Sequence, residues 1–316
     1  MPFAILSDTS GNLPVNLPEK LGISIIPFIY RMDETDHVCM DIENFDGETF
    51  YRDMKAGKQV TTIQIPPQKF MDFFEPFLKK GEDVIFISMS SGISGSCNSA
   101  EIAGRMLKER YPEHSVAVID TKGAALGEGL VALRGAELRA KGLSFSETVE
   151  ALEKMSHRMC NVFTVDDLMF LRRGGRLSNL AAIMGTVLNV KPLLKGDEEG
   201  KIVVFAKLRG RRRAIEALAE RYDSLCVCPE KQTVGIVHAA CREDAELLSK
   251  LLYRNRPPKS VLLVGYEPVT GCHVGPGALA LFFEGSDTVR TDLNNISNVL
   301  SVVKTKIDSV RNALNK

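Results

Sequence analysis

The chain has 316 residues, 44% of them hydrophobic and 25% charged, and its 40 Lys and Arg residues balance its 40 Asp and Glu residues. This length fits two domains with a substantial core, and the balanced charge argues against a dedicated nucleic-acid-binding protein, which usually carries a basic excess. The seven cysteines are scattered along the chain, unlike those of a small secreted disulfide scaffold. The N-terminus turns polar too early for a signal peptide, and no apolar run reaches the ~18–20 residues that span a bilayer. We therefore expect a cytoplasmic protein without a membrane span.

The N-terminal half is predicted to contain a parallel α/β sheet. Short apolar runs at residues 3–6, 84–88 and 116–119 each lead into a small or polar loop, and the last two loops lead into helices. Because ligands of such sheets bind at the carboxyl ends of the strands, these three loops should share one edge. Residues 33–47 are acidic and lack apolar periodicity, so we expect an exposed connection there.

The second half also mixes strands and helices, and its character changes near residue 160. We therefore predict an N-terminal α/β domain over 1–160 and a C-terminal α/β domain over 161–284. Residues 285–316 have apolar side chains at helical spacing and are predicted to form a C-terminal helical tail.

The loop SSGISGS at residues 90–96 has the composition of an anion site. Small residues let backbone N–H groups approach a ligand, the following helix N-terminus favours negative charge, and serine hydroxyls donate hydrogen bonds. A helix-capping loop has the same composition. A third interpretation is a nucleophile elbow, because Ser94 is followed in the chain by Asp120 and His273, the order of α/β hydrolases, although the G-x-S-x-G pattern fails at its last position.

His273 lies in the segment TGCHVGPG, which predicts a tight loop rather than a helix. A histidine there is either a ligand-binding residue or one satisfied by backbone hydrogen bonds. The group Cys226, Cys228, His238 and Cys241 contains metal-ligand types, but its spacings do not match the usual zinc pattern, so no metal site is predicted.

Two arginine clusters stand out. One comprises Arg172, Arg173 and Arg176, and the other runs from Arg209 to Arg213. Each is either a solvated face or a docking site for a phosphate group or an acidic partner. No G-x-x-x-x-G-K-[ST] motif is present, so nothing in the sequence indicates that the chain binds ATP through a P-loop.

Seven segments in order resemble the DegV family, the fatty-acid-binding proteins that serve bacterial fatty acid kinase. They are SDTS, TTIQIP, ISMSSGISGSCNSA, VIDTKGAALGEG, LMFLRRGGRLS, NVKPLL and HVGPGALALFF, and they cover roughly residues 3–284. The resemblance implies an α/β fold of two domains with a ligand tunnel between them. It also implies a bound long-chain fatty acid of the palmitate, stearate or oleate class, no other cofactor, and no catalysis by the chain itself.

The resemblance also implies site residues. The carboxylate ligands of the family fall on Thr62, Ser94 and His273, with backbone N–H groups around Gly95 adding to them. The segment LRRGGRL, which contains the first arginine cluster, is similar to the surface that meets an ATP-dependent fatty acid kinase subunit, the partner that would convert the bound acid to an acyl phosphate. This chain departs from the family pattern at Ile63 and Cys97, where Ser and Tyr are usual, which affects the local loop shape and the tunnel wall.

Overall fold

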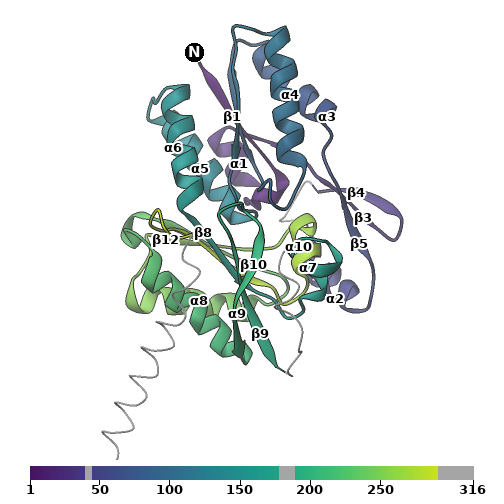
Figure 1. The fold of residues 1–316 in the computed structure, drawn as a ribbon, viewed down its shortest axis with the longest axis vertical. Helices are drawn as coiled ribbons and strands as arrows, with labels where there is room; N and C mark the ends of the chain where they lie inside the picture. The colour runs from purple at the N-terminus through teal and green to yellow at the C-terminus, as the bar shows by residue number, and fades with distance from the viewer. Residues whose placement is uncertain (40–44, 178–188, 291–316) are drawn as a thin grey trace, which may run out of the picture.

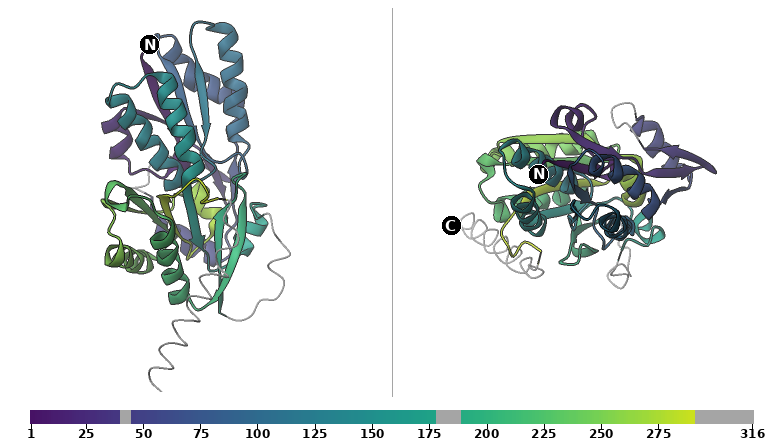
Figure 2. Two further views of the ribbon diagram at one scale, coloured as in Figure 1. Left: turned by 60° about the vertical axis from the view of Figure 1, so that its left-hand side comes forward. Right: turned by 90° about the horizontal axis from the view of Figure 1, so that it is seen from above.

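Three β-sheets and their helices form the molecule. The computed structural model describes residues 1–39, 45–177 and 189–290. A four-stranded sheet with its helices occupies one end of the long axis, and a six-stranded sheet with two further helices occupies the other (Figures 1 and 2). A small three-stranded sheet projects beside them.

The four-stranded sheet is entirely parallel, in the order β2-β1-β6-β7. Its strands are β1 (Phe3–Asp8), β2 (Ile23–Ile26), β6 (Asp83–Ser88) and β7 (Val116–Asp120), with the short helical segments η1 (Thr9–Gly11) and α1 (Asn16–Leu21) between the first two. The three loops that were predicted to share one edge therefore follow the carboxyl ends of neighbouring parallel strands, β1, β6 and β7.

Alternation along the strands explains how this sheet is covered. Val84 and Phe86 on one face pack in a core with the helices α3 (Pro67–Leu78) and α4 (Ser96–Arg110). Ile85 and Ile87 on the other face pack with α5 (Leu126–Ala140) and α6 (Phe145–Arg158). Because both faces are covered, the strand reads as a continuous apolar run.

The six-stranded sheet has the order β10-β9-β8-β13-β11-β12, and only β11 and β12 run parallel. Its strands are β8 (Met159–Thr164), β9 (Val190–Gly196), β10 (Ile202–Arg209), β11 (Thr233–His238), β12 (Ser260–Gly265) and β13 (Leu279–Glu284). The helices α8 (Arg211–Leu225) and α9 (Arg242–Asn255) cover one face, and the short η3 (Pro229–Lys231) precedes β11. Helix α5 also contacts β8, β11 and β13, so one hydrophobic cluster joins the two large sheets.

The small three-stranded sheet and one of the remaining helices differ from the sequence-based predictions. Its strands β4 (Thr35–Val38), β3 (Ile29–Met32) and β5 (Val60–Ile63) are antiparallel, and α2 (Gly47–Lys55), α7 (Met169–Arg173) and α10 (Pro268–Val274) are the remaining helices. The expected connection over 33–47 is exposed at residues 33–38, but it contains a strand, because β4 forms a hairpin with β3 through a turn with positive φ angles at Asp33 and Glu34. Residues 40–44 lie outside the described ranges. The prediction that His273 lies in a loop is wrong, because α10 contains it.

The chain beyond β13 returns to the body of the protein. Residues 285–290 form a bridge to Cys226 and a turn instead of the start of the predicted tail helix, whose remaining residues 291–316 lie outside the described ranges. The buried guanidinium of Arg290 donates hydrogen bonds to backbone carbonyls at residues 121, 122, 156, 157 and 197. No helix in the described part of the chain is long and apolar enough to cross a bilayer.

Candidate functional site

A cavity of about 320 Å³ lies between the two large sheets, within the size range of small-molecule sites. Both parts of the molecule contribute to it, through the loops after β6 and β7 on one side and through β8, β13, α7 and α10 on the other. Its lining is mostly apolar, with the side chains of Phe28, Ile63, Met89, Ile93, Ala125, Phe163, Leu171, Ile202, Tyr266, Val269, Val274 and Phe282.

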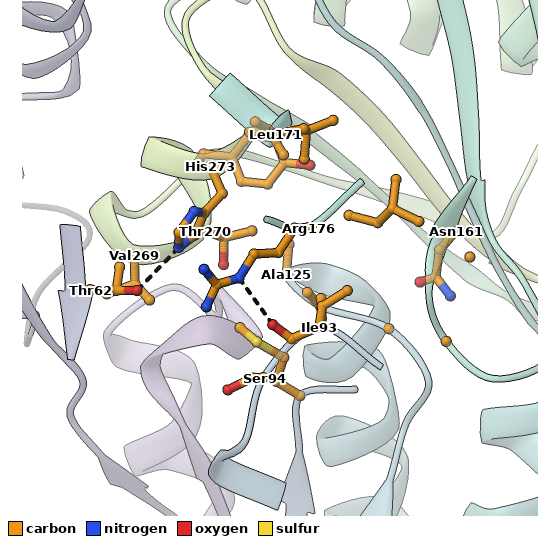
Figure 3. A pocket seen from close by; sticks show the side chains of 18 of the residues that line it. Thr62, Ile93, Ser94, Ala125, Asn161, Leu171, Arg176, Val269, Thr270 and His273 are labelled. Atoms are coloured by element: carbon orange, nitrogen blue, oxygen red, sulfur yellow. Dashed lines mark hydrogen bonds between the residues drawn. The ribbon is translucent and has the colours of Figure 1, made fainter. Parts of the chain in front are cut away.

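Polar side chains gather at one end of this cavity. Thr62, Ser94, Arg176 and His273 lie on one side of the view in Figure 3, and Asn161 lies on the other. The Thr62 hydroxyl is 3.1 Å from His273 Nε2, which joins β5 to α10. We call Thr62, Ser94, Arg176 and His273 the cavity cluster.

Glycines allow α7 and α10 to pack closely enough to place His273. A side chain at Gly174 would clash with the imidazole Nδ1 of His273, and a side chain at Gly275 would clash with the ring of Phe170. Gly275 also has a φ of 78°, which other residues rarely adopt. The GGR segment and the HVGPG segment are therefore two halves of one packing contact.

The loop at residues 90–96, which we call the serine loop, is also held by close packing at a glycine. Gly95 packs directly against the side-chain amide of Gln64, which donates a hydrogen bond of 2.9 Å to Ser99 Oγ. The Ser94 hydroxyl accepts a hydrogen bond of 3.2 Å from the backbone N–H of Ser96, the first residue of α4. No acidic side chain occupies the first turn of this 15-residue helix, so its positive end is directed at the cavity cluster without a carboxylate from that turn.

The electrostatics of the cavity cluster favour an anion. Burial, with a contribution from the nearby Arg176, lowers the pKa of His273 to about 4, so the imidazole is neutral near pH 7. The positive charge comes from Arg176, whose guanidinium donates to the carbonyls of Ile93 (3.1 Å) and Gly174. Within the described ranges, no carboxylate pairs with Arg176. The cluster thus presents hydroxyls, an imidazole and an unneutralised guanidinium at one end of an apolar cavity.

The structure brings the predicted carboxylate ligands together and separates the first arginine cluster. Thr62, Ser94, Gly95 and His273 all line the cavity. Arg172 and Arg173 are exposed on α7, whereas Arg176 lines the cavity. In the sequence Arg176 belongs to the same cluster as Arg172 and Arg173. Its position after two glycines, of which Gly174 packs against His273, is the one sequence feature that distinguishes it from them.

The hydrogen bonds of these residues do not support the serine hydrolase alternative. His273 Nε2 contacts Thr62, and the Ser94 hydroxyl bonds to the backbone, so the described bonds do not join Ser94 to His273. The carboxylate of Asp120 bonds instead to Ser91 (2.5 Å) and Lys122 (2.8 Å). In the described part of the chain, no three His, Cys, Asp or Glu side chains are grouped as metal ligands would be. This holds for Cys226, Cys228, His238 and Cys241 as well.

Fold and site together define an α/β protein with an apolar cavity between its two large sheets and polar donors at one end of that cavity. Comparison with known proteins identifies the family to which this fold belongs. The model of an uncharacterised protein family, DegV, matches residues 2–286, and the chain belongs to the DegV family. The resemblance found in the sequence is therefore confirmed, as is the α/β fold of two parts.

The relatives cover nearly the whole chain. A DegV domain-containing protein of Clostridium perfringens is 34% identical over 287 residues, which is 90% of this chain and 97% of the relative. The protein DegV of Bacillus subtilis is 32% identical, over 89% of this chain and 98% of its own length.

Solved structures show the same architecture. A DegV family protein from Thermus thermophilus, described for its fatty acid binding, superposes with a TM-score of 0.82 at 25% identity and covers 90% of this chain and 100% of its own. The structure of DegV from Bacillus subtilis, described as a fatty acid binding protein, gives a TM-score of 0.75 at 30% identity, with coverage of 90% and 100%.

Proposed function

We propose that this protein binds a long-chain fatty acid of the palmitate, stearate or oleate class in the cavity, with the carboxylate at Thr62, Ser94, His273 and the backbone around Gly95. The observation that carries the proposal is Arg176, a guanidinium that lacks a carboxylate partner in the described residues and lies beside two hydroxyls at one end of an apolar cavity. An anionic head group completes this arrangement. The solved relatives that are described as fatty-acid-binding proteins support the same ligand class.

The energetics of such a ligand suit this cavity. Each buried CH₂ group contributes ~0.8 kcal/mol, so a chain of about sixteen carbons supplies on the order of 10 kcal/mol before the costs of association. A carboxylate is expensive to bury unpaired, and charge-assisted hydrogen bonds from Arg176 and the hydroxyls offset that expense. The neutral imidazole of His273 donates through one nitrogen only, so it orients the head group rather than neutralising it.

The test is lipid extraction followed by binding. Organic extracts of the purified protein are analysed by mass spectrometry, and the delipidated protein is titrated with palmitate and oleate. We expect a co-purifying fatty acid and saturable binding that Ser94→Ala weakens. Ser91→Ala is the matched control, because Ser91 lies on the same loop but bonds to Asp120 and does not line the cavity. A lipid-free protein that takes up neither acid would contradict the proposal.

We further propose that the bound acid is presented to an ATP-dependent fatty acid kinase subunit, which phosphorylates the carboxylate. Two features support this step: the chain contains no P-loop motif of its own, and Arg172 and Arg173 are exposed on α7, adjacent to Gly174, which packs against His273. With such a subunit and ATP, acyl phosphate formation is trapped by hydroxylamine. We expect the double change Arg172→Glu and Arg173→Glu to reduce the rate without affecting fatty acid binding. Charge reversal at the exposed Arg105 and Arg254 should leave both unchanged.

A further inference from the structure

A second hollow lies on the side of the molecule away from the cavity cluster. It has a volume of about 760 Å³ and runs between helices α5 and α6 on one wall and residues 227–233 with Lys259 on the other. In Figure 1 its neighbours α6 and β12 lie at the left, whereas α7 and α10 lie at the right. We call this hollow the basic groove.

The basic groove carries a local charge excess in a chain whose total charge is balanced. Six basic and two acidic side chains line it, an excess of four positive charges, although Lys and Arg equal Asp and Glu over the whole sequence. Glu137 pairs with Arg134, and Glu284 pairs with Arg158. Lys141, Lys231 and Lys259 are exposed and have no ion pair within the described residues.

The groove combines these charges with apolar surface. Val227 is 36% exposed, and Leu133 and Met155, which pack at the edge of a hydrophobic core, are half-buried; all three line the hollow. The basic residues lie on both walls, since Lys141 follows α5 and Lys231 and Lys259 flank β11 and β12. An occupant that satisfies both walls must be acidic along its edges and apolar toward the floor.

We infer that the basic groove binds an acidic amphipathic segment of a protein partner. Charge complementarity selects an acidic occupant, and the apolar floor selects one that also buries hydrophobic side chains, as a helix in a groove does. An anionic lipid surface fits less well, because the site is concave and Glu137 and Glu284 lie within it. This surface is separate from Arg172 and Arg173, so it serves a contact other than the proposed kinase docking.

Cys228 offers a direct probe of the groove. It lines the hollow, and it is the one exposed cysteine among the residues that the structure describes. An environment-sensitive fluorophore is attached to Cys228 of the full chain, with Cys228→Ser as the labelling control. The ligand is a synthetic peptide of about 18 residues, long enough to form a helix, with Leu at helical spacing and Glu elsewhere. A scrambled peptide of equal composition and phosphatidylglycerol vesicles are titrated in parallel.

We expect saturable binding of the amphipathic peptide that weakens with salt. The triple change Lys141→Glu, Lys231→Glu and Lys259→Glu should weaken it by about tenfold or more, since each lost attraction becomes a repulsion. Reversal of three exposed lysines elsewhere, Lys20, Lys69 and Lys250, should leave it unchanged. Circular dichroism confirms that both variants are folded.

Equal affinity of the wild type and the groove variant would overturn the inference. Equal binding of the scrambled peptide would overturn it as well, because the apolar floor would then play no part, and so would a response to vesicles that exceeds the response to the peptide. Each titration is made with delipidated and with palmitate-treated protein. Peptide binding does not depend on the outcome of the fatty acid experiments, so failure of one proposal is distinguishable from failure of the other.

Discussion

Two polar clusters in this protein, one half-buried and one fully buried, both contain hydroxyl groups but differ in the groups that surround those hydroxyls. The cavity cluster has hydroxyls, an imidazole and a guanidinium that face open space. The second, which we call the acid cluster, comprises Ser7, Asp8, Ser10 and Glu128, each of which is at most 1% exposed. There Ser10 Oγ bonds to Asp8 and, at 2.7 Å, to Glu128, while Ser7 Oγ lies 2.9 Å from the other Glu128 oxygen.

The difference lies in the balance of donors and acceptors. The single hydroxyl proton of Ser10 cannot serve two carboxylates at once, so the acid cluster is completed by a proton that one of its carboxyls retains. Burial, with a smaller contribution from the nearby Glu267, raises the pKa of Asp8 to about 7, which agrees with a retained proton. Among the described residues the cavity cluster has the opposite imbalance, a surplus of donors and positive charge. The closed cluster contributes to the stability of the fold, whereas the open one is the site at which we propose that a ligand binds.

The largest expected effect is on stability. Glu128→Ala removes one hydrogen-bond partner from each of the two serine hydroxyls and leaves a hole in a fully buried site, so the free energy of unfolding should fall by about 3 kcal/mol. Glu128→Gln keeps the volume and an acceptor and should cost much less. Urea denaturation followed by circular dichroism measures both. Palmitate affinity of the folded protein should stay within about twofold, and a selective loss of binding at unchanged stability would show that the two clusters are not separate in function.

The next effect is on binding. Arg176→Ala removes the only positive charge of the cavity cluster, and the dissociation constant for palmitate should rise about 10- to 100-fold, equivalent to a loss of about 1.4–3 kcal/mol for a charged hydrogen bond. Isothermal titration calorimetry on delipidated protein gives the value. Arg172→Ala is the matched control, because Arg172 is exposed on α7 and does not line the cavity. Equal loss in both variants would mean that long-range charge, and not the cavity, governs the affinity.

The pH dependence of stability should have opposite signs at the two clusters. The pKa of Asp8 rises from 3.8 to about 7 on folding, so the folded protein holds a proton that the unfolded chain loses, and stability from this group falls as pH rises from about 4 to about 7. The pKa of His273 falls from 6.5 to about 4, so its contribution falls as pH drops through that range. One group changes the slope by at most about 1.4 kcal/mol per pH unit.

Asp8→Asn and His273→Gln separate these contributions. Relative to the wild type, Asp8→Asn should gain stability as pH rises from 5 toward 7, and His273→Gln should gain it as pH falls toward 5. Urea denaturation at several pH values gives the two differences. Slopes of the same sign in both variants would refute the distinction between a proton-holding cluster and a donor-rich one.

Much of the fold follows from local pattern, and the exceptions have physical causes. The apolar run before Ser88 predicts β6, and Ser144 caps α6 as a Ser before a helical pattern should. Strand β4 was not predicted because all four of its residues are exposed, so no apolar alternation marks it. Helix α10 was not predicted because it has only seven residues and ends at a glycine, a composition that also fits a loop.

The site was predictable in part. The serine loop and His273 stood out by residue type, but Thr62 lies on a half-exposed strand of the small sheet and has no local signal. Arg176 is of the same residue type as its exposed neighbours Arg172 and Arg173, and only the two glycines before it distinguish it in the sequence. The meeting of residues 62, 94 and 273 depends on contacts between distant segments, which only the family resemblance anticipated. The resemblance assigned Arg176 to partner docking and did not anticipate its place beside these residues.

The smallest expected effect separates orientation from charge within the cavity cluster. Thr62→Val has the same shape but loses the hydroxyl that contacts His273 Nε2 at 3.1 Å, so the affinity for palmitate should fall about fivefold, equivalent to about 1 kcal/mol for a hydrogen bond. Thr62→Ser retains the hydroxyl and should bind within about twofold of the wild type. The same calorimetric titration ranks these variants against Arg176→Ala. If Thr62→Val were as damaging as the loss of Arg176, the hydroxyl and imidazole pair would be the principal carboxylate ligand. The unpaired guanidinium, on which the contrast with the acid cluster depends, would then be secondary.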